Sequence, residues 1–137
     1  MSKAGWPLQK AIFAALSADS TLALLIGDPP RIYDDPPGEV QLPYVQIGDG
    51  SEADWGTATD TAAEHQFLIH VWSRAGGRME ARAILAVIYD VLHDAALTLE
   101  SNRLVNLRFA LSQVWRETDA ETYHGMARYR AVTEPNS

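Results

Sequence analysis

The segment that decides the fold is Glu64-His65-Gln66-Phe67-Leu68-Ile69-His70-Val71-Trp72-Ser73, because a strand with this sequence is largely apolar on both faces. One face carries Phe67, Ile69 and Val71, and the other carries Leu68, His70 and Trp72. Such a strand belongs in the interior of a sheet, with something packed over each face. In a chain of 137 residues, two helices can hardly cover both faces. We therefore expect a second subunit to cover one of them.

Outward from this strand, hydrophobic spacing predicts two main helices and four further strands. The helices are expected at residues 8–16 and 80–92, with a helical turn at 21–26, and the strands at 31–33, 44–47, 105–115 and 124–133. Strands that follow one another along the chain favour antiparallel pairing. The predicted fold class is therefore α+β, with an antiparallel four- to five-stranded sheet and two helices packed on one face. We expect residues 1–137 to form a single domain.

The strand predicted at residues 105–115 shows the clearest alternation in the chain. Its apolar positions are expected to share one face as Val105, Leu107, Phe109, Leu111 and Trp115. This pattern is typical of a strand with one face on the core and one face in water.

Residues 48–63 are predicted to be a long acidic loop, because they are rich in Gly, Asp, Ser, Thr and Ala. The formal net charge of the chain is −7, and residues 28–64 carry nine acids against one base, so the whole excess lies in this part of the sequence. Trp55 stands alone in the loop, and a tryptophan is costly to leave in water. We expect it to fold back on the domain or to contact a partner.

The titratable residues do not form a catalytic or metal-binding pattern. The chain has no cysteine, which excludes disulfides and thiolate ligands. His65 and His70 are five residues apart in a strand, so they face opposite sides and cannot share an ion. We therefore expect no catalytic residue, no metal and no cofactor. No stretch approaches the roughly 20 apolar residues of a membrane span, and no membrane partner is expected.

Four arginines are expected to lie close together if the last two strands pair. Arg108 and Arg116 share a face of one strand, and Arg128 and Arg130 share a face of the next. The resulting basic ladder would suit the acidic loop of a neighbouring copy. Tight binding to nucleic acid needs denser clusters of Lys and Arg than these, so specific DNA binding is not expected.

The order of several short motifs resembles the tail terminator, or tail completion, proteins of long-tailed phages and phage-like gene transfer agents. The motifs are Arg31-Ile32-Tyr33-Asp34, Pro43-Tyr44-Val45, His70-Val71-Trp72-Ser73, His124-Gly125 and Tyr129-Arg130, together with the helices at 8–16 and 80–92. The resemblance extends over roughly residues 8–132. It implies a structural virion protein and no enzymatic residues.

The resemblance also implies a hexameric ring that caps the tail tube, stops tube polymerisation and joins the tail to the head or neck. The implied partners are further copies of the chain, the tail tube protein and a neck or head-completion protein, with DNA passing through the lumen without specific binding. The protein would be cytoplasmic during assembly and afterwards part of the particle. The residues expected at subunit or tube interfaces are Asp49, Glu52, Asp54, Trp55, His70, Trp72, Arg108, Arg116, Arg128 and Arg130.

Two other functions remain open at this point. A neck or head-completion connector protein has a similar size and occupies an adjacent position in the particle. A small ligand-binding or enzymatic α+β domain is a different class, and the lack of converging histidines and carboxylates argues against it.

Overall fold

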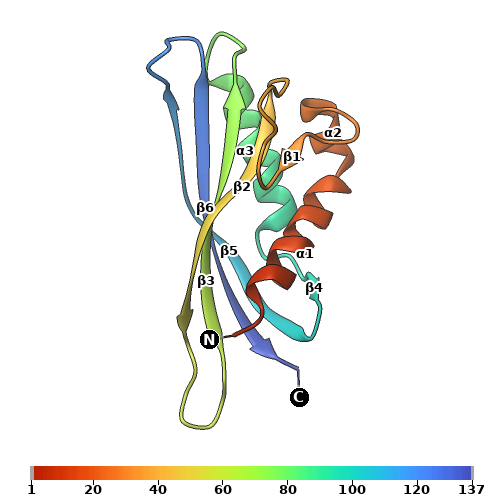
Figure 1. The fold of residues 1–137 in the computed structure, drawn as a ribbon, viewed down its shortest axis with the longest axis vertical. Helices are drawn as coiled ribbons and strands as arrows, with labels where there is room; N and C mark the ends of the chain where they lie inside the picture. The colour runs from red at the N-terminus through yellow and green to blue at the C-terminus, as the bar shows by residue number, and fades with distance from the viewer. Residues whose placement is uncertain (1, 137) are drawn as a thin grey trace.

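A computed structural model describes residues 2–136, which form three helices and a mixed six-stranded sheet (Figure 1). The helices are α1 (Gly5–Ser17), α2 (Ser20–Ile26) and α3 (Met79–Leu92). The strands are β1 (Ile32–Tyr33), β2 (Tyr44–Asp54), β3 (Ala63–Ser73), β4 (Thr98–Leu99), β5 (Asn102–Arg116) and β6 (Tyr123–Pro135). The order across the sheet is β1-β2-β3-β6-β5-β4.

The α+β class is confirmed, but the prediction of four or five antiparallel strands was wrong in detail. Strands β2, β3, β6 and β5 form the antiparallel centre. Two strands of only two residues, β1 and β4, extend the sheet at its edges. β1 runs parallel to β2, because residues 34–43 carry the chain back before β2 begins. β1 lies within the strand predicted at residues 31–33, whereas β4 was not predicted, because a strand of two residues shows no periodicity in a sequence.

The helices lie on one side of the sheet, as predicted, but they number three rather than two (Figure 1). The segment expected to be a turn is a separate helix, α2, because the Asp19 carboxylate accepts the backbone N–H of Leu22 and caps it. Gly27 ends this helix with φ of +97°, a conformation that side chains with Cβ rarely adopt. No single helix within residues 2–136 is long and apolar enough to cross a membrane, although α1 and α2 pass that test as a bent pair.

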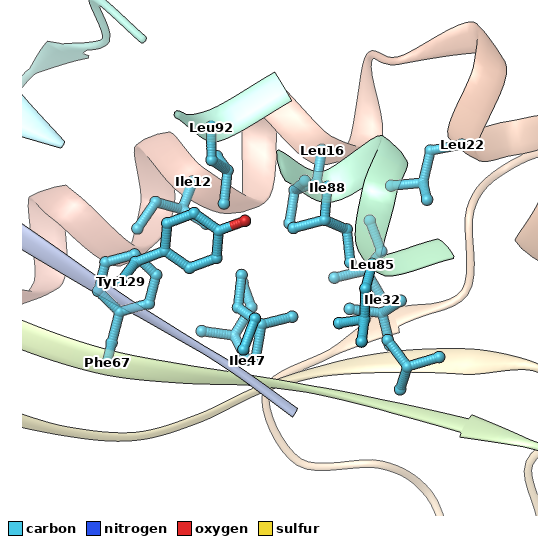
Figure 2. Packing of buried hydrophobic residues seen from close by; sticks show 14 of the residues in the cluster. Ile12, Leu16, Leu22, Ile32, Ile47, Phe67, Leu85, Ile88, Leu92 and Tyr129 are labelled. Atoms are coloured by element: carbon cyan, nitrogen blue, oxygen red, sulfur yellow. The ribbon is translucent and has the colours of Figure 1, made fainter. Parts of the chain in front are cut away.

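The hydrophobic core fills the space between the helices and the sheet (Figure 2). The inner face of β3 contributes Phe67, Ile69 and Val71, all of which are buried, and α3 contributes Ile84 and Ile88. Tyr129 of β6 is the largest fully buried side chain of this core. Its hydroxyl has no hydrogen-bond partner, and Figure 2 shows the oxygen pointing into the apolar cluster.

The predicted interior position of β3 is confirmed, since it lies between β2 and β6. Its outer face differs from its inner face. Leu68, His70 and Trp72 are only partly buried there, and no element of the described chain lies over them (Figure 1). The chain itself therefore covers only one of the two apolar faces that the sequence predicts.

The long loop predicted at residues 48–63 was wrong in its bounds. β2 continues to Asp54 and pairs with β3 along most of its length, so the connecting loop covers only residues 55–62. The pairing is irregular between Ile47 and Gly50, where a β-bulge interrupts the register. Backbone hydrogen bonds hold this segment in the sheet despite its lack of apolar alternation.

The single apolar face predicted for residues 105–115 was also wrong. Register shifts between Leu104 and Asn106 and between Phe109 and Leu111 change which residues face the core. Leu107 is buried on the inner face, whereas Leu111 pairs with Arg128 on the outer face and is 36% exposed. Each bulge inserts a residue and reverses the alternation that follows it.

Candidate interaction surfaces

A row of aromatic and imidazole rings crosses the uncovered outer face of the sheet. We call Tyr44, Trp72, His70, His124 and Trp115 the aromatic row. The register places them on adjacent strands, because Trp72 pairs with both Tyr44 and His124, and His124 pairs with Trp115. The His124 ring lies 3.7 Å from the Trp72 centroid and 4.3 Å from that of Trp115. The row therefore spans four strands, β2, β3, β6 and β5.

A chain of hydrogen bonds runs through the row and ends on Glu117. Oε1 of Glu117 accepts the indole N–H of Trp115 at 2.9 Å and lies 2.8 Å from Nδ1 of His124. Nε2 of His124 lies 2.7 Å from Nδ1 of His70. A carboxylate only accepts, so Nδ1 of a neutral His124 donates to it, and Nε2 then accepts from His70. The two imidazoles are thereby fixed in single tautomers.

Burial favours the neutral form of both histidines. It lowers the pKa of His70, and the nearby His124 lowers it further, whereas Asp49 opposes the shift. Burial also lowers the pKa of His124, against the opposing effect of Glu117. The rings of the row are therefore uncharged near neutral pH, and an aromatic surface of this kind is suited to contact with another protein.

The turn at residues 117–122 positions Glu117. The Asp119 carboxylate accepts the backbone N–H and the hydroxyl of Thr122, and these bonds lower the pKa of Asp119 to about 2. The backbone N–H of Glu117 donates to the carbonyl of Thr122 across the same turn. The Glu117 carboxylate, which accepts the ring N–H groups of Trp115 and His124, is therefore held in place by a hydrogen-bonded turn.

Gly48 of β2 leaves space for the ring of His70, which lies on the neighbouring strand β3. A Cβ at this position would lie 2.7 Å from Cδ2 and 2.8 Å from Nε2 of the His70 ring, closer than real Cβ contacts. The glycine therefore lets the imidazole lie flat against the backbone of the neighbouring strand.

Trp55 and Arg130 fasten the β2–β3 hairpin to the outer face. The Arg130 guanidinium lies 4.8 Å from the centroid of the Trp55 ring, and its Nε donates to Glu64 at 2.6 Å. Hydrogen bonding to Arg130 lowers the pKa of Glu64. Through this contact Trp55 folds back on the domain, which is one of the two outcomes expected from the sequence. Its side chain nevertheless remains 54% exposed.

The structure brings only some of the predicted arginines together. Arg108 pairs in register with Arg130, and Arg128 follows on the same face of β6. Arg116 pairs with Tyr123 at the far end of β5, away from the other three. Arg130 is occupied within its own chain, and Nε of Arg108 lies 3.8 Å from Asp94. A ladder of four side chains is not formed, because the residue inserted between Phe109 and Leu111 places Arg116 on the face opposite Arg108.

The predicted acidic positions lie on β2. Asp49 and Asp54 are exposed, whereas Glu52 is half-buried, accepts a hydrogen bond from Ser2 and lies 3.7 Å from Nδ1 of His65. His65 faces the helices and contacts the Thr133 hydroxyl at 2.9 Å, on the side opposite His70 as predicted. Within residues 2–136, no three His, Asp or Glu side chains converge on one point.

Sequence reasoning did not include Tyr44, Trp115, Glu117 and His124 among the interface residues. Trp115 and Glu117 flank the predicted Arg116 in the sequence, and Tyr44 and His124 pair in register with the predicted Trp72. Pairing the strands on either side of the 117–122 turn would have placed Trp115 opposite His124. The bulge at Phe109 and Leu111 concealed this signal, because the alternation had assigned Trp115 to the core face.

An apolar groove lies between the N-terminal half of α1 and β2. Its volume is about 520 Å³, and its walls include Trp6, Gln9, Ile47 and Phe67. Trp6 is 61% exposed, and Phe13, about two turns further along α1, is 46% exposed. Exposed aromatic side chains at a groove are typical of protein contacts rather than of catalysis.

Comparison with known proteins agrees with this architecture. The model of the family described as tail completion protein gp17 matches residues 10–134. The chain is 29% identical over 131 residues to tail completion protein gp17 of Bacillus phage SPP1, which spans 94% of this chain and 93% of that protein. A chain in the structure titled "Virion of native gene transfer agent (GTA) particle" matches with a TM-score of 0.90 and 34% identity, over 98% of this chain and 99% of that one.

The class that these observations define is a structural protein of phage-like tails. The chain belongs to the tail completion protein gp17 family. The predicted resemblance is thereby confirmed, including its extension to gene transfer agent particles. This family is not a family of enzymes.

Proposed function

We propose that this protein completes the tail of a phage-like particle by forming a ring on the end of the tail tube. The observation that carries this proposal is the outer face of β3. Its centre is aromatic and partly apolar, and no described element of the chain covers it. Since one copy buries only the inner face of β3, further copies of the same chain are the simplest way to cover its outer face. The match to a chain of a gene transfer agent virion supports a place in such a particle.

A ring follows if the contact is heterologous, because a repeated head-to-tail contact about an axis closes on itself. We propose six copies around a central hole. In this arrangement the ring caps the tube, stops further tube growth and offers its far side to a neck or head-completion protein. The acidic excess supports an open lumen, since DNA that passes through would be repelled rather than held.

The contact residues that we propose are the partly exposed members of the aromatic row, His70 and Trp72, and the charged side chains of β2, β5 and β6. Trp55 is proposed for contact with the tube, because its ring is exposed and the loop between β2 and β3 that carries it lies at one end of the sheet (Figure 1). In the cell the protein would assemble in the cytoplasm and then remain in the particle.

Native mass spectrometry of the purified protein, alone and mixed with tail tubes, tests the ring. A sixfold species supports it, and a protein that stays a single copy under both conditions contradicts it. Electron microscopy after deletion of the gene tests the role. Overlong or headless tails indicate a terminator, whereas normal free tails together with leaking heads indicate the neck or head-completion connector.

A further inference from the structure

His70 and His124 form a hydrogen-bonded pair that holds fewer protons than two separate histidines. Nδ1 of His70 lies 2.7 Å from Nε2 of His124, on adjacent strands of the uncovered face. One of the two nitrogens must accept this bond, because two N–H groups cannot bond to each other. We call these two residues the histidine pair. It exists in the neutral form or with one added proton, and a second added proton breaks the bond between its rings.

The first added proton leaves the histidine pair intact. Nδ1 of His124 lies 2.8 Å from Oε1 of Glu117, so the nitrogen of the neutral pair that remains without a proton is Nε2 of His70. A Cβ on Gly48 would lie 2.8 Å from this nitrogen, which therefore faces β2. The neighbouring Asp49 of the same strand favours a charged His70 ring. Protonation at Nε2 thus retains both hydrogen bonds.

Few other charges act on the histidine pair. Arg128 lies on the same face of β6, and its positive charge disfavours added protons. Arg74 lies 3.7 Å from Asp119, so these two charges largely compensate each other. The uncharged side chains around the pair on this face are Tyr44, Gln46, Trp72, Gln113, Trp115 and Met126. The helices lie on the other side of the sheet (Figure 1), so the acids that act on the pair are Glu117 and Asp49.

A second added proton alters the whole aromatic row. The His124 ring lies between Trp72 and Trp115, at centroid distances of 3.7 and 4.3 Å. Glu117 holds one side of this ring and His70 holds the other, so loss of the bond to His70 leaves it held at one side only. The row then also carries two imidazolium charges, which a neighbouring copy would have to bury. Both effects oppose a contact on this face.

We infer that a neighbouring copy binds the aromatic row only while the histidine pair stays hydrogen-bonded, so that the proposed ring opens when the pair takes up a second proton. The inference rests on the proposed function and adds a regulation of its contact surface. Burial lowers the pKa of both histidines, so the pair is neutral and the contact complete near neutral pH. Because separated copies bind more protons than assembled ones, assembly weakens as the pH falls below about 6.5.

Nitrogen NMR of protein labelled in its histidine rings tests the histidine pair itself. Between about pH 8 and about pH 5, the two rings are expected to take up protons in two steps that belong to the pair and lie more than about one pH unit apart. Two rings that take up their protons independently, each at an ordinary pKa near 6.5, overturn the inference.

Sedimentation velocity over the same pH range tests the effect on assembly. The association constant of each contact is expected to fall by up to about tenfold per pH unit for each proton taken up, and to recover when the sample is neutralised. Circular dichroism at each pH establishes that the separated copies remain folded. A ring that persists where NMR finds both rings of the pair charged overturns the regulation and leaves the ring standing.

A His70→Gln protein separates the pair from its surroundings. The glutamine amide can still donate to Nε2 of His124, but two charged rings can no longer face each other. The readout is assembly at about pH 5 relative to assembly at neutral pH, and this ratio is expected to be at least about tenfold higher than in the wild type. A ratio equal to that of the wild type overturns the inference.

His65→Gln is the matched control, because His65 is also buried and its pKa is also lowered, but it faces the helices and contacts Thr133. It is expected to lose assembly at the same pH as the wild type. If it resists acid as the His70→Gln protein should, the inner histidine is the cause and the inference is overturned. A wild-type protein that forms no ring at any pH, alone or on tail tubes, overturns the proposed function, and the regulation with it.

Discussion

Replacing Tyr129 by phenylalanine should leave the protein as stable as the wild type or make it more stable. The Tyr129 side chain is fully buried, and its hydroxyl oxygen has no hydrogen-bond partner. An orphaned buried hydroxyl costs about 1–3 kcal/mol of desolvation relative to the unfolded chain. Burial also raises the pKa of this phenol, which keeps the side chain neutral at any ordinary pH.

The same substitution removes little packing. The ring stacks on Phe67 at 5.7 Å and meets Phe109 edge-on at 5.8 Å, and both contacts persist in the Tyr129→Phe protein. The space left by one oxygen costs a few tenths of a kcal/mol, at about 24 cal/mol for each Å³ of cavity. The net expectation is a gain of about 1 kcal/mol in the free energy of unfolding, or roughly 3–5 °C in Tm for a domain of this size.

Urea unfolding followed by far-ultraviolet circular dichroism measures this change. All proteins are compared at one concentration, because assembly would add to the apparent stability. Tyr89→Phe is the matched control, since Tyr89 is 39% exposed and its hydroxyl can reach water, and it should change stability by less than about 0.5 kcal/mol. A Tyr129→Phe protein that is less stable by 1 kcal/mol or more would show that the hydroxyl is bonded, and the reasoning would fail.

Three further predictions concern the outer face and the histidines. Burial lowers the pKa of three histidines, His65, His70 and His124. The unfolded chain therefore binds more protons than the folded one, and the free energy of unfolding should fall as the pH drops below about 6.5. Arg130→Ala should redshift Trp55 emission, because the ring loses its cation–π contact and its fastening to β6. Gly48→Ala should cost about 1–3 kcal/mol, because the new Cβ displaces the His70 ring, and urea unfolding measures the loss.

Each of these predictions has a control or an outcome that contradicts it. The pH effect should shrink in a His65→Gln, His70→Gln, His124→Gln protein, and an unchanged pH profile counts against it. The emission change must vanish in an Arg130→Ala protein that also carries Trp55→Phe. Gly38→Ala serves as the matched glycine control, because a Cβ there meets nothing within 4 Å. If both alanine variants lose equal stability, the close approach of His70 is not the cause.

The sequence predicted those parts of the fold that have a strong local signature. The two-sided apolar pattern of β3 placed it inside the sheet, and the spacing of apolar residues in α1 and α3 located both helices. The edge strand β4 escaped prediction because two residues have no period, whereas β1 lies within the strand predicted at residues 31–33. The extension of β2 to Asp54 escaped because backbone pairing, rather than apolar side chains, holds Gly, Asp and Ser in the sheet.

The candidate surface was predictable only in part, for a related reason. His70 and Trp72 were found because they share the strand that decides the fold. Trp115 and His124 depend on the register between β5 and β6, and a single inserted residue in β5 determines that register. The position of a bulge depends on the partner strand as well as on the strand itself, so one alternating pattern cannot reveal it.

The position of β6 has a consequence for biosynthesis. β6 is synthesised after the other described strands, yet it lies between β3 and β5 and pairs with residues up to 70 positions earlier, as in Ala63 with Thr133. Until β6 has been synthesised, β3 and β5 cannot be joined in one sheet, and each exposes an unpaired strand edge that is prone to aggregation. Formation of the complete sheet must therefore wait for the synthesis of β6, and it is expected to be slow for the length of the chain, because distant segments must meet. Synthesis of β6, rather than formation of the early helices, is therefore expected to permit the native sheet to form.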